Sequence, residues 1–297
     1  MNETQSTLRH VLAATDFSVP ATQALERAAR LVREHGAHLV VAHVLSQGGL
    51  DDLLHWLRGG AQWARQLHDQ AHASLASAVN ALGVNAVPEL LDGAPVPALC
   101  GAALRHGADL TVIGARGENP LHQRLLGGTA ERLLRKSPSA LLVVRQPAQR
   151  DYQSVLVPVD FSAWSLQAVR LARRVAPRAT LVLHHSFVIP FEEKLRFAGV
   201  GDDVLSDYRE RARSEARDGL LALARAASLD GHDHRLSLGE GDAPQRILDV
   251  AKARECDLIV IGKHGRGAAE ELLLGSVTRQ VLEEAEVDVL VSQAHAD

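Results

Sequence analysis

Two glycine-rich segments carry the residue types that could bind an anion. In the second half of the chain, Gly262-Lys-His-Gly265 is followed after nine residues by Gly275-Ser276. Glycines leave backbone N–H groups uncovered and accept backbone conformations that other residues avoid. A helix that begins near Gly275-Ser276 would add unpaired N–H groups and the positive end of its dipole. The Ser276 hydroxyl could donate to a phosphate oxygen or help to hold a hydrated Mg²⁺. The spacing therefore predicts a phosphate-binding loop.

The first half of the chain holds a less complete version of the same segment. It reads Gly114-Ala-Arg-Gly117, then nine residues, then Gly127-Gly128-Thr129. Gly128 stands where the second half has Ser276, and the hydroxyl of Thr129 comes one place later. We therefore expect the second segment to bind a phosphate more tightly. In both segments the glycines could also be turn and helix-start residues with no ligand, and for the first segment that interpretation is equally favoured.

The elements that must position these loops form an internal repeat. The segment 10–18, HVLAATDFS, corresponds to 154–162, SVLVPVDFS, and the segment 109–114, DLTVIG, corresponds to 257–262, DLIVIG. Both copies thus place an Asp-Phe-Ser after one apolar run and a glycine after another. The chain of 297 residues suits two domains. We predict domains at 1–147 and 152–297, joined by a polar, proline-containing linker.

Each copy alternates short apolar runs with helical patterns. Runs that are apolar throughout predict strands buried on both faces of a parallel sheet. Open sheets of this class bind ligands at the carboxyl ends of their strands, where Asp160 and Gly262 both lie. The predicted strands are 11–15, 38–45, 85–90, 110–113, 140–144, 154–159, 179–188, 234–238, 258–261 and 287–291. The predicted longer helices are 20–34, 51–82, 128–136, 163–176, 203–228 and 276–285, and Ser18 and Ser162 are the expected N-caps of two of them.

Composition excludes several classes of function. The net charge is −4 and no basic block is present, so nucleic acid and anionic membranes gain no electrostatic support as partners. The two cysteines lie in different halves and favour a reducing, cytoplasmic setting without a disulfide. The start of the chain lacks the apolar stretch of a signal peptide, and no apolar run is long enough to span a bilayer. His184-His185 and the pair His232 and His234 lack a third ligand, so no metal site is predicted.

The loop pattern, the Asp160-Phe161-Ser162 turn and the repeat together resemble the universal stress protein family. The resemblance covers essentially the whole chain, twice, as in tandem members. It implies two adenine-nucleotide alpha-hydrolase-like, Rossmann-like α/β domains, each with a five-stranded parallel sheet of order 3-2-1-4-5 and helices on both faces. It also implies ATP as ligand, with Asp160 at the adenine–ribose end and the position after the second-strand histidine on the base.

The expected nucleotide-binding residues follow from the motif and the resemblance. In the second domain they are Asp160, Ser186, Gly262, Gly265, Gly275, Ser276 and Val277. In the first domain they are Asp16, Val44, Gly114, Gly117, Gly127 and Thr129. A less favoured alternative is that Asp16 and Asp160 simply cap the helices that follow them, a role that is compatible with ligand contact.

The leading hypothesis for function is an ATP-binding, stress-response protein that regulates and does not catalyse. No G-x4-G-K-[ST] loop is present, which argues against a fast ATPase. A slow ATPase remains an alternative, as does a scaffold whose first pocket binds a small molecule other than a nucleotide. The last strands, 140–144 and 287–291, are apolar edge strands that need covering. We predict that the two halves pack together through them as an internal pseudo-dimer, and a homodimer is a further option.

Overall fold

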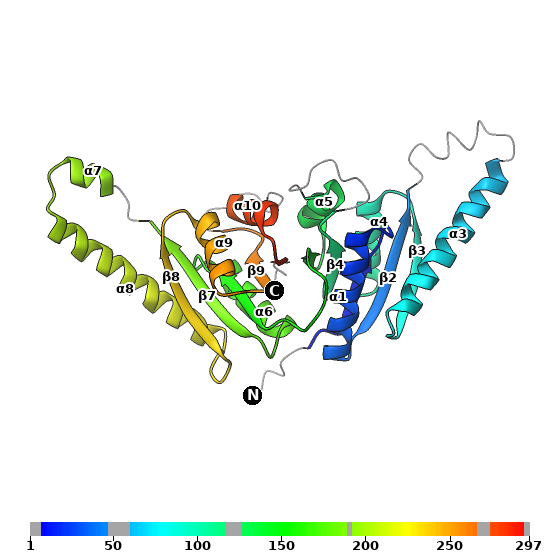
Figure 1. The fold of residues 1–297 in the computed structure, drawn as a ribbon, viewed down its shortest axis with the longest axis horizontal. Helices are drawn as coiled ribbons and strands as arrows, with labels where there is room; N and C mark the ends of the chain where they lie inside the picture. Colours follow the sequence, from blue (N-terminus) through cyan, green and yellow to red (C-terminus); the bar gives the residue numbers. More distant parts are fainter. Residues whose placement is uncertain (1–6, 47–59, 117–125, 189–191, 266–273, 294–297) are drawn as a thin grey trace. The chain divides into compact units, whose positions relative to one another are not determined.

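A computed structural model of the chain describes residues 7–46, 60–116, 126–188, 192–265 and 274–293 (Figure 1). Contacts between Cα atoms divide it into two compact units, Met1–Asp151 with Glu286–His295 and Tyr152–Ala285 with Ala296–Asp297. The units differ from the predicted domains in one respect, because the last strand groups with the first unit. The exact domain boundaries stay a prediction.

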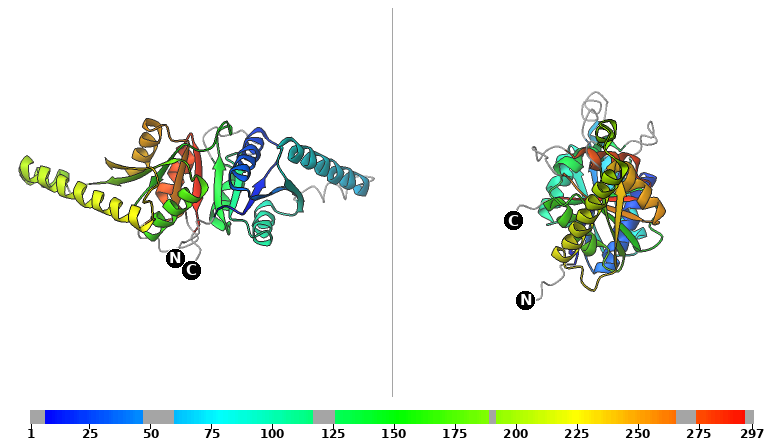
Figure 2. Two further views of the ribbon diagram at one scale, coloured as in Figure 1. Left: turned by 90° about the horizontal axis from the view of Figure 1, so that it is seen from below. Right: turned by 90° about the vertical axis from the view of Figure 1, so that its left-hand side faces the viewer.

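The first unit is a parallel sheet with helices on both faces (Figures 1 and 2). Its strands follow the order β3-β2-β1-β4-β5, which confirms the predicted 3-2-1-4-5 arrangement for this unit. Helices α1 and α3 pack on one face, while α4 and α5 cover the other. The elements are β1 (His10–Ala14), α1 (Val19–His35), β2 (His38–Leu45), α3 (Gly60–Ala81), β3 (Ala86–Asp92), α4 (Pro95–Arg105), β4 (Leu110–Gly114), α5 (Gly128–Lys136) and β5 (Ala140–Val144).

The second unit repeats this design with four parallel strands in the order β9-β6-β7-β8. Helices α6 and α8 pack on one face, and α9 and α10 cover the other. The short helix α7 was not predicted from the sequence. The elements are β6 (Ser154–Pro158), α6 (Ala163–Val175), β7 (Thr180–Phe187), α7 (Glu192–Phe197), α8 (Asp202–Ala226), β8 (His234–Glu240), α9 (Ala243–Ala253), β9 (Leu258–Gly262) and α10 (Ser276–Glu284).

The final strand, β10 (Asp288–Ser292), pairs antiparallel with β5, and Leu290 lies opposite Leu142. The prediction that these two last strands lie together is confirmed. The antiparallel direction of this pair was not predicted from the sequence. A buried ion pair accompanies it, because Arg27 Nε of α1 lies 3.3 Å from Asp288 Oδ2.

The strands that carry the loops are buried, as their largely apolar sequences predict. Residues Leu110 to Ile113 of β4 and Leu258 to Ile261 of β9 are all at most 6% exposed. Such strands need cover on both faces, and the paired helix layers provide it. Among the described helices, none is long and apolar enough to cross a membrane.

The turn between the first strand and the first helix of each unit has the same geometry. Ser18 and Ser162 are N-caps, and their hydroxyls accept from the backbone N–H groups of Ala21 and Ser165, as predicted. The preceding residues, Phe17 and Phe161, have positive φ angles of 64° and 62°. A bulky side chain at positive φ is unfavourable unless its surroundings hold it there. Each turn therefore holds the neighbouring aspartate, Asp16 or Asp160, in a fixed position.

Candidate functional site

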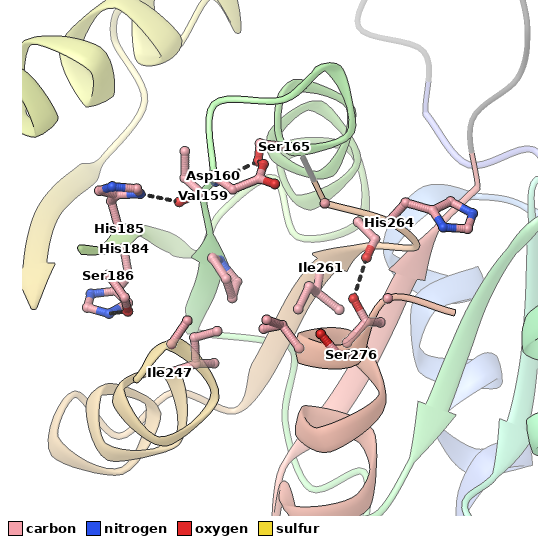
Figure 3. Close-up of a pocket in the computed structure, with 17 residues that line it drawn as sticks. Val159, Asp160, Ser165, His184, His185, Ser186, Ile247, Ile261, His264 and Ser276 are labelled. Atoms are coloured by element: carbon pink, nitrogen blue, oxygen red, sulfur yellow. Dashed lines mark hydrogen bonds between the residues drawn. The ribbon is translucent and has the colours of Figure 1, made fainter. Parts of the chain in front are cut away.

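A cavity of about 470 Å³ opens at the carboxyl ends of the strands in the second unit (Figure 3). It lies between the end of β6, the end of β7, the start of α9 and the loop that leads into α10. All the residues predicted for a site in this half line it, namely Asp160, Ser186, Gly262, Gly265, Gly275, Ser276 and Val277. The folded chain thus brings together residues that lie up to 117 positions apart in the sequence (160 to 277).

The helix start at one end of this cavity is suited to an anion. Gly275 precedes α10 in an extended conformation, and no side-chain hydrogen bond caps the first turn within the described residues. Two contacts fix the position of this turn. The Gly275 N–H donates to the Lys263 carbonyl at 3.0 Å, and the buried Thr278 hydroxyl donates to the Gly262 carbonyl at 2.8 Å. The remaining N–H groups of the turn and the helix dipole therefore meet the cavity in a fixed position.

Each of the three loop glycines is needed for a different physical reason. A Cβ at Gly262 would lie 2.9 Å from the Trp164 Cβ, so this glycine lets α6 approach β9. A Cβ at Gly265 would lie 2.9 Å from Asp160 Oδ2, so this glycine makes room for the carboxylate. A Cβ at Gly275 would meet only ordinary contacts, with the Lys263 carbonyl at 3.4 Å and the Gly265 nitrogen at 3.7 Å. The absence of a side chain at Gly275 is therefore not needed for packing, and its main effect is to keep the cavity open.

Asp160 supports the turn before α6 and also faces the cavity. Its Oδ1 accepts hydrogen bonds from the Ser162 N–H at 3.0 Å and from the hydroxyls of Ser162 and Ser165 at 2.5 Å each. These bonds hold the turn and the start of α6. The carboxylate also lines the cavity. Ser165 was not singled out from the sequence, because its role depends on the fold of the turn.

The opposite end of the cavity is a polar wall built on β7. His184 Nδ1 lies 3.0 Å from the Ser237 hydroxyl, and His184 Nε2 lies 3.0 Å from the Ser186 hydroxyl. The neighbouring His185 instead bonds to the Val159 carbonyl at 2.6 Å and packs against Phe161. The two histidines therefore take different partners, as expected for consecutive strand positions.

Burial sets the protonation of His184. The side chain is only 1% exposed. Desolvation, reinforced by the nearby His185, lowers the pKa of His184 to about 4, although its hydrogen bond to Ser237 acts in the opposite direction. The ring is consequently neutral at pH 7, with one donor nitrogen and one acceptor nitrogen.

This shift predicts a pH dependence of stability. Between about pH 6.5 and 4 the unfolded chain protonates His184 whereas the folded chain does not, so stability falls as the pH falls. The loss approaches ~3 kcal/mol once the pH is near 4, at 1.36 kcal/mol per pKa unit. Urea unfolding at several pH values should show that His184→Asn, which cannot titrate, is less acid-sensitive by this amount. The exposed His38 supplies the control variant His38→Asn, and equal acid sensitivity of all three proteins would contradict the assignment.

The first unit has a similar cavity of about 410 Å³ in the equivalent place. Of the residues predicted for it, Asp16, Val44, Gly114, Gly127 and Thr129 line it. Gly117 lies outside the described residues. Gly114, like Gly262, allows close packing, because a Cβ added at this position would lie 2.8 Å from the Pro20 carbonyl carbon.

The two cavities differ at the helix start. Relative to α10, α5 has Gly128 in place of Ser276 and Ala130 in place of Thr278, so it lacks the hydroxyl that ties α10 to its strand. Its first turn carries Glu131, where α10 carries Arg279. Glu131 is paired with Arg135 and does not line the first cavity, whereas Arg116 lines it and favours a bound anion.

Comparison with known proteins assigns both halves of the chain to one family. A model of the universal stress protein family matches residues 7–145 and again residues 151–293. The chain belongs to the universal stress protein family. A universal stress protein from Mycobacterium tuberculosis strain H37Rv is 28% identical over 247 residues, which are 79% of this chain and 74% of that protein. One from Methanocaldococcus jannaschii is 27% identical over 141 residues, 47% of this chain and 81% of its own.

Solved structures agree on the fold of this tandem universal stress protein. The crystal structure of a universal stress protein from Archaeoglobus fulgidus superimposes with a TM-score of 0.68, covering 96% of this chain and 98% of that one. The two sequences are 19% identical, so the likeness bears on fold alone. The α/β architecture and the tandem arrangement are thereby confirmed.

Sequence reasoning missed several residues of the second cavity. Ser165 and Thr278 fix the two turns, and His184 polarises the far wall. Comparison of the two copies holds a signal for all three, because the first copy has Ala21, Ala130 and Ala42 at these positions. Where one copy has a hydroxyl or imidazole next to a predicted site and the other has alanine, the two sites differ in chemistry.

Proposed function

We propose that this tandem universal stress protein binds an adenine nucleotide, ATP with Mg²⁺, in the cavity of its second domain, and that it regulates a stress response. The observation that carries the proposal is the convergence of every predicted residue of that half on one cavity beside an uncapped helix start. The phosphates lie at the start of α10, where N–H groups, the dipole and the Ser276 hydroxyl meet them. The base lies toward Ser186, with Asp160 between.

The composition of the cavity favours binding over catalysis. A general base must reach the attacking water. Asp160 is the only carboxylate among the described lining residues, and its Oδ1 already accepts three hydrogen bonds. His184 is neutral and on the far wall, and His185 bonds to the Val159 carbonyl, so a slow ATPase would depend on His264.

The first domain has a weaker or different ligand in this proposal. Its helix start has Gly128 where the second domain has the hydroxyl of Ser276, and Val44 and Leu99 give its inner wall an apolar surface. These features support the second candidate function for this half, a scaffold pocket that holds a small molecule other than a nucleotide. The β5–β10 pair supports an internal pseudo-dimer of the domains predicted at 1–147 and 152–297. The unpaired thiols Cys100 and Cys256 support a cytoplasmic setting.

Native mass spectrometry after gentle purification tests the proposal. We expect one adenine nucleotide per chain, either retained or taken up from added Mg-ATP, and no faster release of phosphate than from the Gly275→Val variant. A protein that takes up no nucleotide would contradict the proposal. Rapid phosphate release that Gly275→Val abolishes would instead identify an ATPase.

A further inference from the structure

The wall of the second cavity that faces away from the phosphate end has polar side chains at two positions where the first cavity has apolar ones. On β7 it presents His184 and Ser186, where β2 presents Ala42 and Val44. We propose that Ser186 is the residue that determines base specificity, and that it reads the hydrogen-bonding edge of a purine through a relay of Ser237 and His184. This inference rests on the proposed function of the same cavity.

The relay has a defined geometry. Ser237 on β8 is directly opposite His184 in the parallel pairing, and the two lie 3.0 Å apart at Oγ and Nδ1. The other ring nitrogen lies 3.0 Å from the Ser186 hydroxyl. Gly239 makes room for the ring, because a Cβ there would lie 3.0 Å from its Cε1, and the His184 side chain is only 1% exposed. The imidazole therefore holds Ser186 in one place at the cavity surface.

The chemistry of a neutral imidazole makes Ser186 adaptable. If Ser237 donates to Nδ1, Nε2 carries the proton and donates to Ser186, whose own O–H then points to the ligand. If Ser186 donates to Nε2, Nδ1 donates to Ser237, and Ser186 offers the ligand a lone pair. The edge of a purine combines acceptor and donor atoms, and either state of the relay can pair with one of them. Val44 can offer only van der Waals contact.

The place of this wall in the cavity fits the base. Figure 3 shows His184, Ser186 and Ile247 on one side of the cavity, and His264 and Ser276 on the other. A nucleotide whose phosphates lie at the start of α10 must therefore extend its base toward β7 and α9. Ile247 and Ala243 of α9 offer apolar surface to the face of the ring, and Ser186 offers the polar group for its edge. A bound ring would cover the half-buried Ser186, and a polar group covered in this way discriminates against ligands that leave it unpaired.

Titration of the full-length chain with two nucleotides tests this. One is ATP, and the other is the triphosphate of benzimidazole riboside, which keeps the ring shape, the ribose and the phosphates but lacks the nitrogens of the six-membered ring and the amino group. We expect the wild type to bind ATP at least about tenfold more tightly. In Ser186→Val the ratio should fall to near one, through weaker ATP binding. Ser186→Thr should preserve it, and His184→Ala should reduce it.

The controls separate the possible failures. Ser214→Val makes the same substitution at an exposed position of α8 and should leave the ratio unchanged. A wild type that binds neither compound would refute the proposed function. A wild type that binds both equally, or an unchanged ratio in Ser186→Val, would overturn the role of Ser186 and leave nucleotide binding intact. Because the readout is a ratio within one protein, a general loss of stability does not imitate the expected result.

Discussion

Replacing Arg27 with leucine should lower the free energy of unfolding by about 3–5 kcal/mol. Asp288 is completely buried and Arg27 is 5% exposed, and Arg27 Nε lies 3.3 Å from Asp288 Oδ2. The arginine also donates from Nη1 to the Arg150 carbonyl at 2.8 Å. Leucine would remove one cationic partner of a carboxylate that water cannot reach, while Arg145, whose charge also interacts with Asp288, would remain. Urea denaturation followed by circular dichroism measures the loss.

Two further variants make this expectation specific. Arg30→Leu breaks an ion pair with Asp151 that is about one-third exposed, and it should cost no more than about 1 kcal/mol. The double variant Arg27→Leu with Asp288→Asn removes both charges, yet keeps a side-chain oxygen for the N–H groups of Arg145 and Gln146. It should recover much of the lost stability. A single Arg27→Leu variant as stable as Arg30→Leu would show that this pair does not hold β10 in place.

Gly275→Val should abolish tight binding of Mg-ATP without unfolding the protein. The backbone at Gly275 has φ −59° and ψ 147°, which valine adopts readily, and a Cβ there meets only ordinary contacts. The Cβ would, however, lie 3.7 Å from the Gly265 nitrogen, so the valine methyl groups would cover the N–H groups of the loop. Calorimetric titration should show no tight site, while the unfolding temperature stays close to that of the wild type.

The first unit provides the matched control. Gly127 has nearly the same backbone angles, φ −63° and ψ 143°, and lines the equivalent cavity. Gly127→Val should leave the tight site nearly unchanged, because the tight site belongs to the second unit. The missing hydroxyl at Gly128 weakens the first site by at least about tenfold, since a hydrogen bond to a charged group is worth ~1.5–3 kcal/mol. The reverse pattern would mean that Arg116 and Val44 outweigh the loss.

The sequence predicted most of the fold because its signals are local and repeated. The apolar runs at 110–113 and 258–261 are buried strands, and the serines after Asp16 and Asp160 cap helices. Spacing alone identified the loop into α10, and every described residue predicted for the two sites lies at a cavity.

The parts that sequence reasoning missed depend on contacts between distant segments. The role of Gly262 follows from how closely Trp164 approaches β9, which spacing cannot show. The state of His184 follows from its burial beside Ser237 on the next strand. The grouping of β10 with the first unit follows from its pairing with β5 and is accompanied by the ion pair of Asp288 with Arg27, 261 positions earlier (288 minus 27). Such pairs become visible only when the strand order and register are known.

Calorimetric titration of the wild-type chain with Mg-ATP tests the central claim most directly. The cavity of the second unit, with its uncapped helix start and the Ser276 hydroxyl, should give about one tight site per chain, and any second site should be at least about tenfold weaker. Two sites of equal affinity would contradict the asymmetry between the cavities. The absence of any binding heat at several temperatures, together with no change in thermal stability on adding Mg-ATP, would contradict nucleotide binding itself.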